Sequence, residues 1–226
     1  MGQPNGDQVM QNNLVLSAVL ALAAMIGPAS AETITFGDAL AGALPKEFVS
    51  ALTGTGTAGR WEVVEDASAE GGQALAQLSE DTTNYRFPLA IYMPTLPSDL
   101  EARVRFKAIS GSVDQAGGVV VRLQSAQNYY LARANALENN VRFYRVKGGR
   151  REELAGANTR VTAGEWHTLS LRAQGSRFVV SFDGQALIDA RDEAFSSPGK
   201  VALWTKADSV TRFDHIEILP LDATHP

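Results

Sequence analysis

The chain contains no cysteine among its 226 residues. This absence excludes disulfide bonds, thiolate metal sites and cysteine nucleophiles, and a domain of this size can bury enough surface to fold without cross-links. The chain also lacks a basic surplus, because 20 Lys and Arg stand against 25 Asp and Glu and the net charge is −5. No nucleic-acid partner is therefore expected, since such surfaces usually carry a basic patch.

Residues 1–31 contain neither lysine nor arginine, although they include an apolar run at 14–27 and an Ala-Ser-Ala sequence at 29–31. The run is shorter than the roughly 20 residues of a membrane-spanning helix. Its pattern predicts a secretory signal peptide cleaved after residue 31. The missing positive charge leaves open translation from Met10 or an uncleaved anchor. We expect residues 32–226 to form one domain in the periplasm or outside a bacterium, with no membrane contact after cleavage.

Beyond the apolar run, the chain shows strand patterns and no amphipathic helix longer than a turn or two. Residues 100–108 alternate apolar and charged side chains, which is typical of a half-buried antiparallel strand with a solvated face. Hairpin turns are indicated at 147–150 and at Asp183-Gly184. Residues 37–59, rich in glycine and alanine, are expected to form a long loop. Strands at 8–12-residue spacing predict an all-β, two-sheet antiparallel sandwich.

Three predicted strands, GGVVVRLQS, NYYLARAN and KVALWTK, carry polar and aromatic groups at the positions that alternate with their apolar residues. These side chains are Arg122, then Tyr129, Arg133 and Asn135, then Trp204 and Lys206. Because successive side chains of a strand point to opposite faces, we expect all six on one sheet face. Guanidinium and amide groups suit sugar hydroxyls and a flat ring suits a sugar's C–H face, so carbohydrate is the favoured ligand. Purely structural roles for these residues stay open alternatives.

Residues 164–187 resemble the Trp-bearing hairpin of laminin G-like and concanavalin A-like lectin and glucanase jelly rolls. Residues 114–146 and 199–218 resemble a secreted bacterial family described as 3-keto-disaccharide hydrolase-like or family 16 glycoside hydrolase-like, and the likeness extends over roughly 33–219. It implies a jelly roll with a sugar site on a concave sheet face. The Glu-x-Asp-x-x-Glu catalytic strand of family 16 enzymes is absent, so laminarinase-type chemistry is not expected.

Some acidic residues near this face could have further roles. Glu138 and Asp208 are the possible acid/base or saccharide-binding carboxylates, and Asp114 could contribute to a calcium site. No other cofactor is expected, and the oligomeric state is not defined. Three functions remain: a carbohydrate-binding domain, a hydrolase of a 3-keto or otherwise modified disaccharide, and a structural or adhesive domain without a small ligand.

Overall fold

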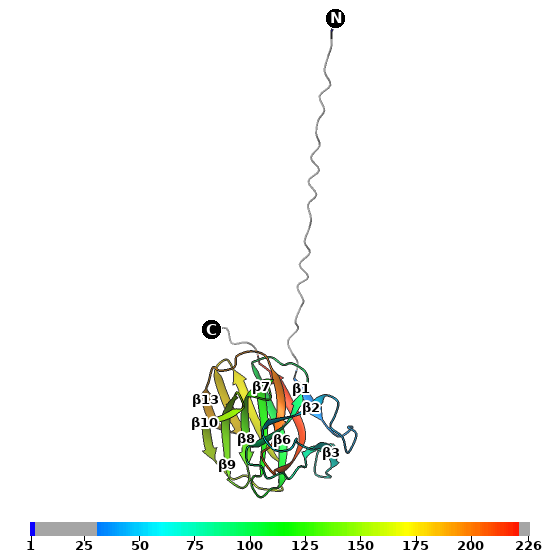
Figure 1. The fold of residues 1–226 in the computed structure, drawn as a ribbon, viewed down its shortest axis with the longest axis vertical. Coiled ribbons are helices and arrows are strands. Elements are labelled where there is room, and N and C mark those ends of the chain that lie inside the picture. Colours follow the sequence, from blue (N-terminus) through cyan, green and yellow to red (C-terminus); the bar gives the residue numbers. More distant parts are fainter. Residues whose placement is uncertain (3–30, 222–226) are drawn as a thin grey trace.

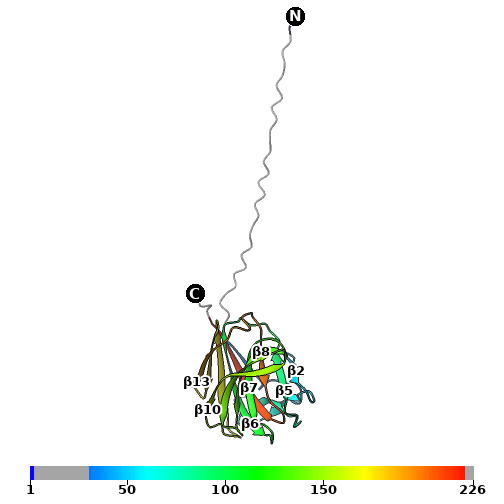
Figure 2. The ribbon, with the colours of Figure 1, turned by 60° about the vertical axis from the view of Figure 1, so that its left-hand side comes forward.

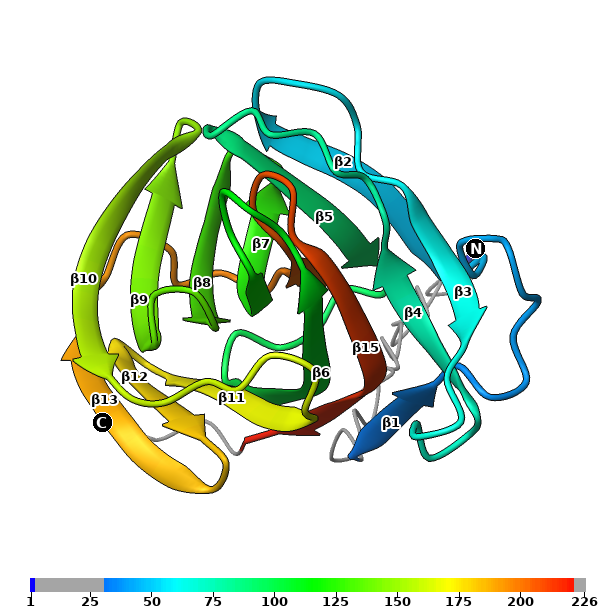
Figure 3. The same cartoon turned by 90° about the horizontal axis from the view of Figure 1, so that it is seen from below.

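The computed structural model describes residues 1, 2 and 31–221. These residues form strands and no helix, and so contain no helix that is long and apolar enough to cross a membrane. The signal peptide predicted from the sequence lies, apart from its ends, outside the described residues. The all-β prediction is confirmed, and the strands lie in two sheets that are stacked as two layers (Figures 1 and 3).

One sheet has eight antiparallel strands. In spatial order they are β13 (Gln185–Arg191), β12 (Arg177–Phe182), β11 (His167–Gln174), β6 (Leu100–Ser110), β15 (Val210–Pro220), β4 (Gln73–Gln77) and β3 (Trp61–Glu65), with β1 (Glu32–Thr35) paired to β15. The central strands, β6 and β15, pair along almost their whole length, with Ile216 opposite Val104 and a register shift between Phe213 and His215. The hairpin turn predicted at Asp183-Gly184 is confirmed, since it joins β12 to β13 as an antiparallel pair, and β11 and β12 form a second hairpin.

The other sheet has seven antiparallel strands, several of which face the viewer in Figure 2. In spatial order they are β10 (Arg150–Asn158), β9 (Asn140–Lys147), β8 (Asn128–Asn135), β7 (Ala116–Ser125), β14 (Lys200–Trp204), β5 (Arg86–Tyr92) and β2 (Phe48–Gly54). The predicted strands with polar alternate positions, β7, β8 and β14, are all in this sheet, and β7 lies between the other two. The alternating side chains that these strands direct to one face of the sheet are therefore neighbours, and the side chains between them are neighbours on the other face.

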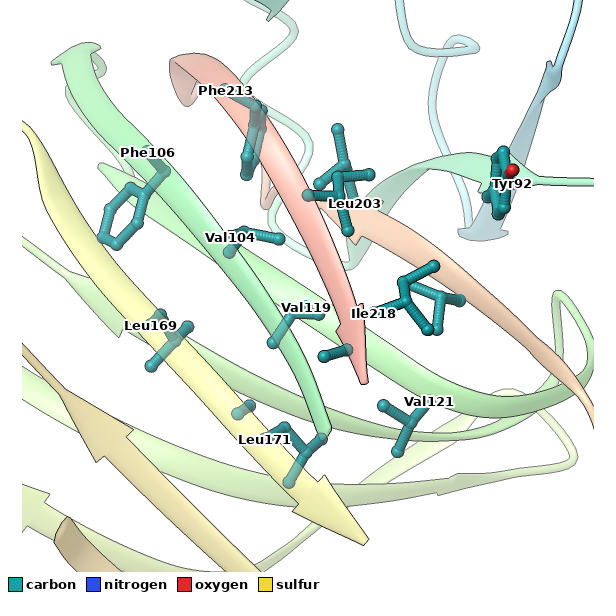
Figure 4. Packing of buried hydrophobic residues seen from close by; sticks show 14 of the residues in the cluster. Tyr92, Val104, Phe106, Val119, Val121, Leu169, Leu171, Leu203, Phe213 and Ile218 are labelled. Atoms are coloured by element: carbon teal, nitrogen blue, oxygen red, sulfur yellow. The ribbon is translucent and has the colours of Figure 1, made fainter. Parts of the chain in front are cut away.

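The main core fills the space between the sheets. Val104 of β6 and Leu169 of β11 face Val119 of β7 and Leu203 of β14, and all four side chains are fully buried (Figure 4). Each such side chain contributes about 1.5–3 kcal/mol of hydrophobic stabilisation. The predicted strand phase is correct here: Val119 and Val121 of β7 and Val201 and Leu203 of β14 point inward, whereas Leu123, beyond a bulge in β7, lies on the outer face.

Two strands were not predicted, and they are the two edges of the seven-stranded sheet. β2 lies within the expected loop at 37–59, and β10 follows the hairpin turn at 147–150. Their sequences, FVSALTG and RREELAGAN, do not alternate clearly between apolar and polar residues. An edge strand has a neighbouring strand on one side only, so its sequence is under less demand for a regular apolar pattern. The loop prediction for 37–59 is therefore wrong at Phe48–Gly54, where pairing with β5 supplies the order.

The charged face of β6 also differs from the expected solvated surface. Lys107 is only 8% exposed, and its Nζ lies 2.6 Å from a carboxylate oxygen of the buried Asp66. Arg212 donates to the same carboxylate at 2.8 Å. At this place the charged side chains on the outer face of the eight-stranded sheet form buried ion pairs with one another and are only partly in contact with water.

Candidate functional site

The outer face of the seven-stranded sheet carries a second buried cluster, which we call the outer-face cluster. Its apolar members come from five neighbouring strands and include Phe87, Leu131, Tyr144 and Trp204. Trp204 stacks on Phe87, with ring centroids 5.4 Å apart and an angle of 19° between the planes. Trp204 is fully buried, so its ring does not offer an open platform for a sugar in this arrangement.

Tyr129 is also fully buried in the outer-face cluster. Its hydroxyl forms a 2.9 Å hydrogen bond with Thr53 Oγ1 of β2. Burial raises the pKa of Tyr129 to about 12. Tyr129 is therefore on the expected face, but its polar atom is already bound to the edge strand.

Arg133 is the centre of the polar part of the cluster. Its side chain is buried, and it donates to the Asn140 Oδ1 atom, to Glu138 Oε2 at 2.7 Å and to the Tyr144 hydroxyl at 3.3 Å. The guanidinium carbon lies 5.8 Å from the centre of the Tyr144 ring. Its Nε atom is buried without a hydrogen-bond acceptor among the described residues. Arg133 is thus fixed in position, with one N–H group that has no partner among the described residues.

Glu138 lies in the turn between β8 and β9 and keeps 43% of its side chain exposed. The turn is shaped by Asn135, whose Oδ1 accepts hydrogen bonds from the backbone N–H groups of Leu137 and Glu138. Burial opposes ionisation of Glu138, but the charge of Arg133 and hydrogen bonds from Asn140 and Arg133 outweigh it and lower the pKa. Both bonds go to Oε2, so Oε1 can accept from a ligand.

Asp114 and Lys206 form a second charged pair next to Asn135. The Lys206 Nζ atom lies 2.5 Å from Asp114 Oδ2, and Asn135 donates to Asp114 Oδ1 at 2.8 Å. Burial raises the pKa of Asp114, although Lys206 opposes the shift. An ammonium group beside this carboxylate is an unfavourable neighbour for calcium, which collects oxygen ligands. Asp114 orients Asn135 and Lys206, and its calcium role stays a prediction.

Asp208 holds the loop that carries Asp114. Its carboxylate accepts from the Ser112 backbone N–H at 2.6 Å, from the Ser112 hydroxyl at 2.8 Å and from the Asp114 backbone N–H at 3.0 Å. Burial acts against ionisation, yet these donors lower the pKa of Asp208. The preceding Ala207 has a φ of 48°, a left-handed conformation that costs energy for a residue with a side chain. The catalytic role predicted for Asp208 is not supported by this position, and it stays a prediction.

Arg122 does not join the other five residues. A bulge interrupts β7 between Val121 and Ser125, and Arg122 has a φ of 50°. Its buried guanidinium therefore turns away and lies 5.1 Å from the centre of Phe178, which belongs to the core between the sheets. It donates to the backbone oxygens of Ser98, Phe195 and Gly175 and to the Asp99 carboxylate. The expectation of one shared face is wrong for Arg122, because strand alternation fails at a bulge.

The structure adds two residues that the sequence did not indicate: Tyr144 and Arg151. Arg151 of β10 lies over the face of the sheet, with its guanidinium carbon 4.5 Å from the centre of Tyr144 and 4.7 Å from that of Phe87. The Gly148-Gly149 turn was the available signal. A tight hairpin there pairs β10 with β9 and places Arg151 opposite Val146, whose side chain is in the outer-face cluster.

One possible metal group lies elsewhere, on the eight-stranded sheet. Within residues 31–221, Glu70, Asp214 and His215 offer ligand atoms that lie within 4.8 Å of one another. Arg105 already forms an ion pair with Asp214. A metal ion at this position would compete with a guanidinium, so the group is best described as part of the ion-pair network.

The chain has limited sequence similarity to known proteins. No protein-family model matches it. A levanase of Bacillus subtilis (strain 168) is 32% identical over 82 residues, which are 36% of this chain and only 12% of the levanase. This match is too short to show a family. The narrower resemblance to 3-keto-disaccharide hydrolase-like proteins therefore stays a prediction.

Solved structures define the fold. The carbohydrate binding module CBM66 from Bacillus subtilis matches with a TM-score of 0.59 at 21% identity, covering 75% of this chain and 94% of that module. A Bacillus licheniformis beta-glucanase matches with a TM-score of 0.57 at 13% identity, covering 85% of this chain and 99% of the glucanase. The chain has the concanavalin A-like jelly-roll fold, as the resemblance implied.

Proposed function

We propose that this chain is a carbohydrate-binding domain that holds a saccharide at the outer-face cluster. The observation that carries this proposal is the arrangement around Glu138. Arg133 and Asn140 fix the Glu138 carboxylate through one oxygen, while the other oxygen and nearly half of the side chain remain open. A preorganised, ionised acceptor beside an aromatic ring and an arginine suits recognition of a sugar hydroxyl.

The comparisons support this proposal through two proteins whose names refer to carbohydrates, a levanase and a carbohydrate binding module. Levan, the substrate implied by the name of the levanase, is therefore the first saccharide to test. The apolar run at residues 14–27 and these bacterial relatives also support an exported protein that meets its ligand in the periplasm or outside the cell.

Binding is favoured over hydrolysis because of the state of the two carboxylates. The lowered pKa of Glu138 keeps it ionised, which suits an acceptor and does not suit a general acid. The Asp208 carboxylate is engaged by Ser112, Val113 and Asp114. A glycosidase normally needs one carboxyl group that remains protonated near neutral pH, and neither residue supplies it.

The proposal is tested by calorimetric titration with levan, β-glucan and oligogalacturonide oligosaccharides, together with analysis of the incubated sugars for cleavage products. Glu138→Gln keeps the shape of the side chain and removes its charge. We expect this substitution to lower the affinity for the tightest-binding saccharide at least about tenfold, because hydrogen bonds to charged groups are stronger than those between neutral groups. Glu152→Gln is the control, since Glu152 on β10 is exposed and forms an ion pair with Arg145 of β9.

Unchanged affinity in Glu138→Gln would place the site elsewhere, whatever the result for Glu152→Gln. Binding of none of the saccharides would contradict the proposed function itself. Release of products by the native protein that stops in Glu138→Gln would show an enzyme in place of a binding domain.

A further inference from the structure

The cations of the outer-face cluster differ in whether a carboxylate neutralises them. Arg133 pairs with Glu138 and Lys206 pairs with Asp114. Arg151 has no carboxylate within ion-pair distance among residues 31–221, and its Nη1 atom is buried without a hydrogen-bond acceptor there. The cluster thus contains one positive charge that the described part of the chain does not compensate.

Aromatic rings hold Arg151 in place. Its guanidinium carbon lies within 6 Å of the ring centres of Tyr144, Phe87 and Trp204, at 4.5, 4.7 and 5.9 Å. Ring faces attract a cation, but they do not accept hydrogen bonds in the plane of the guanidinium fork. The rings therefore position the fork without supplying an acceptor, and the Nη1 atom is left without a hydrogen-bond partner among the described residues. Tyr85, whose hydroxyl accepts from the Arg151 backbone N–H at 3.1 Å, fixes the start of the strand.

Arg133 presents a second unpartnered donor near the same ring. Its Nε atom is buried without an acceptor among the described residues, and its side chain is only 6% exposed. Both guanidinium groups lie within 6 Å of the centre of Tyr144. Two donors from different strands, with one net positive charge between them after Glu138 is counted, match the planar, singly charged carboxylate group.

We propose that the saccharide bound at the outer-face cluster carries a carboxylate, as in a uronic acid, and that Arg151 is the residue that selects it. This inference rests on the proposed function and narrows it to a class of ligand. The chain as a whole has a net charge of −5, so it does not attract acidic saccharides in general. Selection of a carboxylate must therefore come from the local charge, which a low-dielectric, partly buried position strengthens.

The test compares an oligogalacturonide with its methyl ester, which has the same sugar rings and no charge. We expect the free acid to bind the native protein at least about tenfold more tightly at low salt. This preference should shrink as salt is added, because screening weakens the attraction between partly exposed charges. In Arg151→Gln the two ligands should bind equally. Arg151→Lys should keep part of the preference, since it retains the charge and loses the fork.

Arg150→Gln is the matched control, because Arg150 is the exposed neighbour of Arg151 on the same strand. It should keep the full preference for the acid. If the ester or levan binds the native protein as tightly as the acid, the carboxylate inference is wrong and the proposed function survives. If a sulfated oligosaccharide binds more tightly than the uronate, the ligand is an anion of another class and the inference is likewise overturned. If no saccharide binds, both fail. The comparison of the two ligands on native protein decides the matter even if Arg151→Gln does not fold.

Discussion

The outer faces of the two sheets both carry charged and aromatic side chains, but they arrange them differently. On the eight-stranded sheet, Lys107 and Arg212 share the carboxylate of Asp66, and Arg105 pairs with Asp214. On the seven-stranded sheet, the charges sit around a buried aromatic cluster, and Arg151 has no acidic partner among the described residues.

This difference decides what a ligand would have to displace at each of these two places. Where cations already share a buried carboxylate, as Lys107 and Arg212 do at Asp66, a ligand must break existing pairs. Where donors are positioned but unpaired, a ligand can supply the missing acceptor without that cost. Residue types alone do not make this distinction, because both faces contain tryptophan, arginine and lysine.

The largest expected difference between the two faces is in the free energy of unfolding that is lost when a tryptophan on each face is replaced by alanine. Trp204→Ala should lower the free energy of unfolding by about 3–5 kcal/mol, because a fully buried indole leaves a cavity. Trp166→Ala, on the eight-stranded sheet, should cost about 1 kcal/mol, since it removes a hydrogen bond to Ser68 and a contact with Lys107. Urea unfolding measures both. Equal losses would show that the outer-face cluster is not a second core.

A smaller, pH-dependent effect is expected at Asp66. Burial acts against its ionisation, but Lys107, Ser68 and Arg212 outweigh it and lower the pKa. Its contribution to stability is therefore complete above the unfolded pKa, about 4, and is lost as the pH falls further. At neutral pH, Asp66→Asn should lower the free energy of unfolding by about 3 kcal/mol.

Unfolding in urea at a series of pH values checks this prediction. The difference between native protein and Asp66→Asn should close as the pH drops below about 4. Asp189→Asn is the control, because Asp189 forms an exposed ion pair with Arg177 and should change stability little. A difference that stays constant down to the acid limit would mean that Asp66 is not ionised in the folded protein.

Much of the fold could be predicted from the sequence, because strands in the middle of a sheet alternate clearly. The phase of β8 and β14 was correct, which placed Tyr129, Arg133 and Trp204 on one face. The edge strands β2 and β10 could not be predicted, since one-sided pairing does not demand a strong apolar pattern. Arg151 was missed together with β10.

The remaining errors in the site have local causes. Arg122 left the shared face because a bulge changed the direction of its side chain, and no residue type marks that bulge in the sequence. Trp204 has the expected phase, but its burial depends on Phe87 from β5 and on Arg151 from β10. Contacts between strands that are distant in sequence decide exposure, and a single strand's pattern does not contain them.

The most direct test of the central claim is a map of the binding surface in solution. Isotope-labelled protein is titrated with the tightest-binding saccharide of the panel, and the backbone amide signals are followed by NMR. We predict shifts at Arg133, Glu138, Tyr144 and Arg151, with the signals of β6 and β11 unchanged. Shifts confined to β6 and β11 would place the ligand on the eight-stranded sheet and contradict the account.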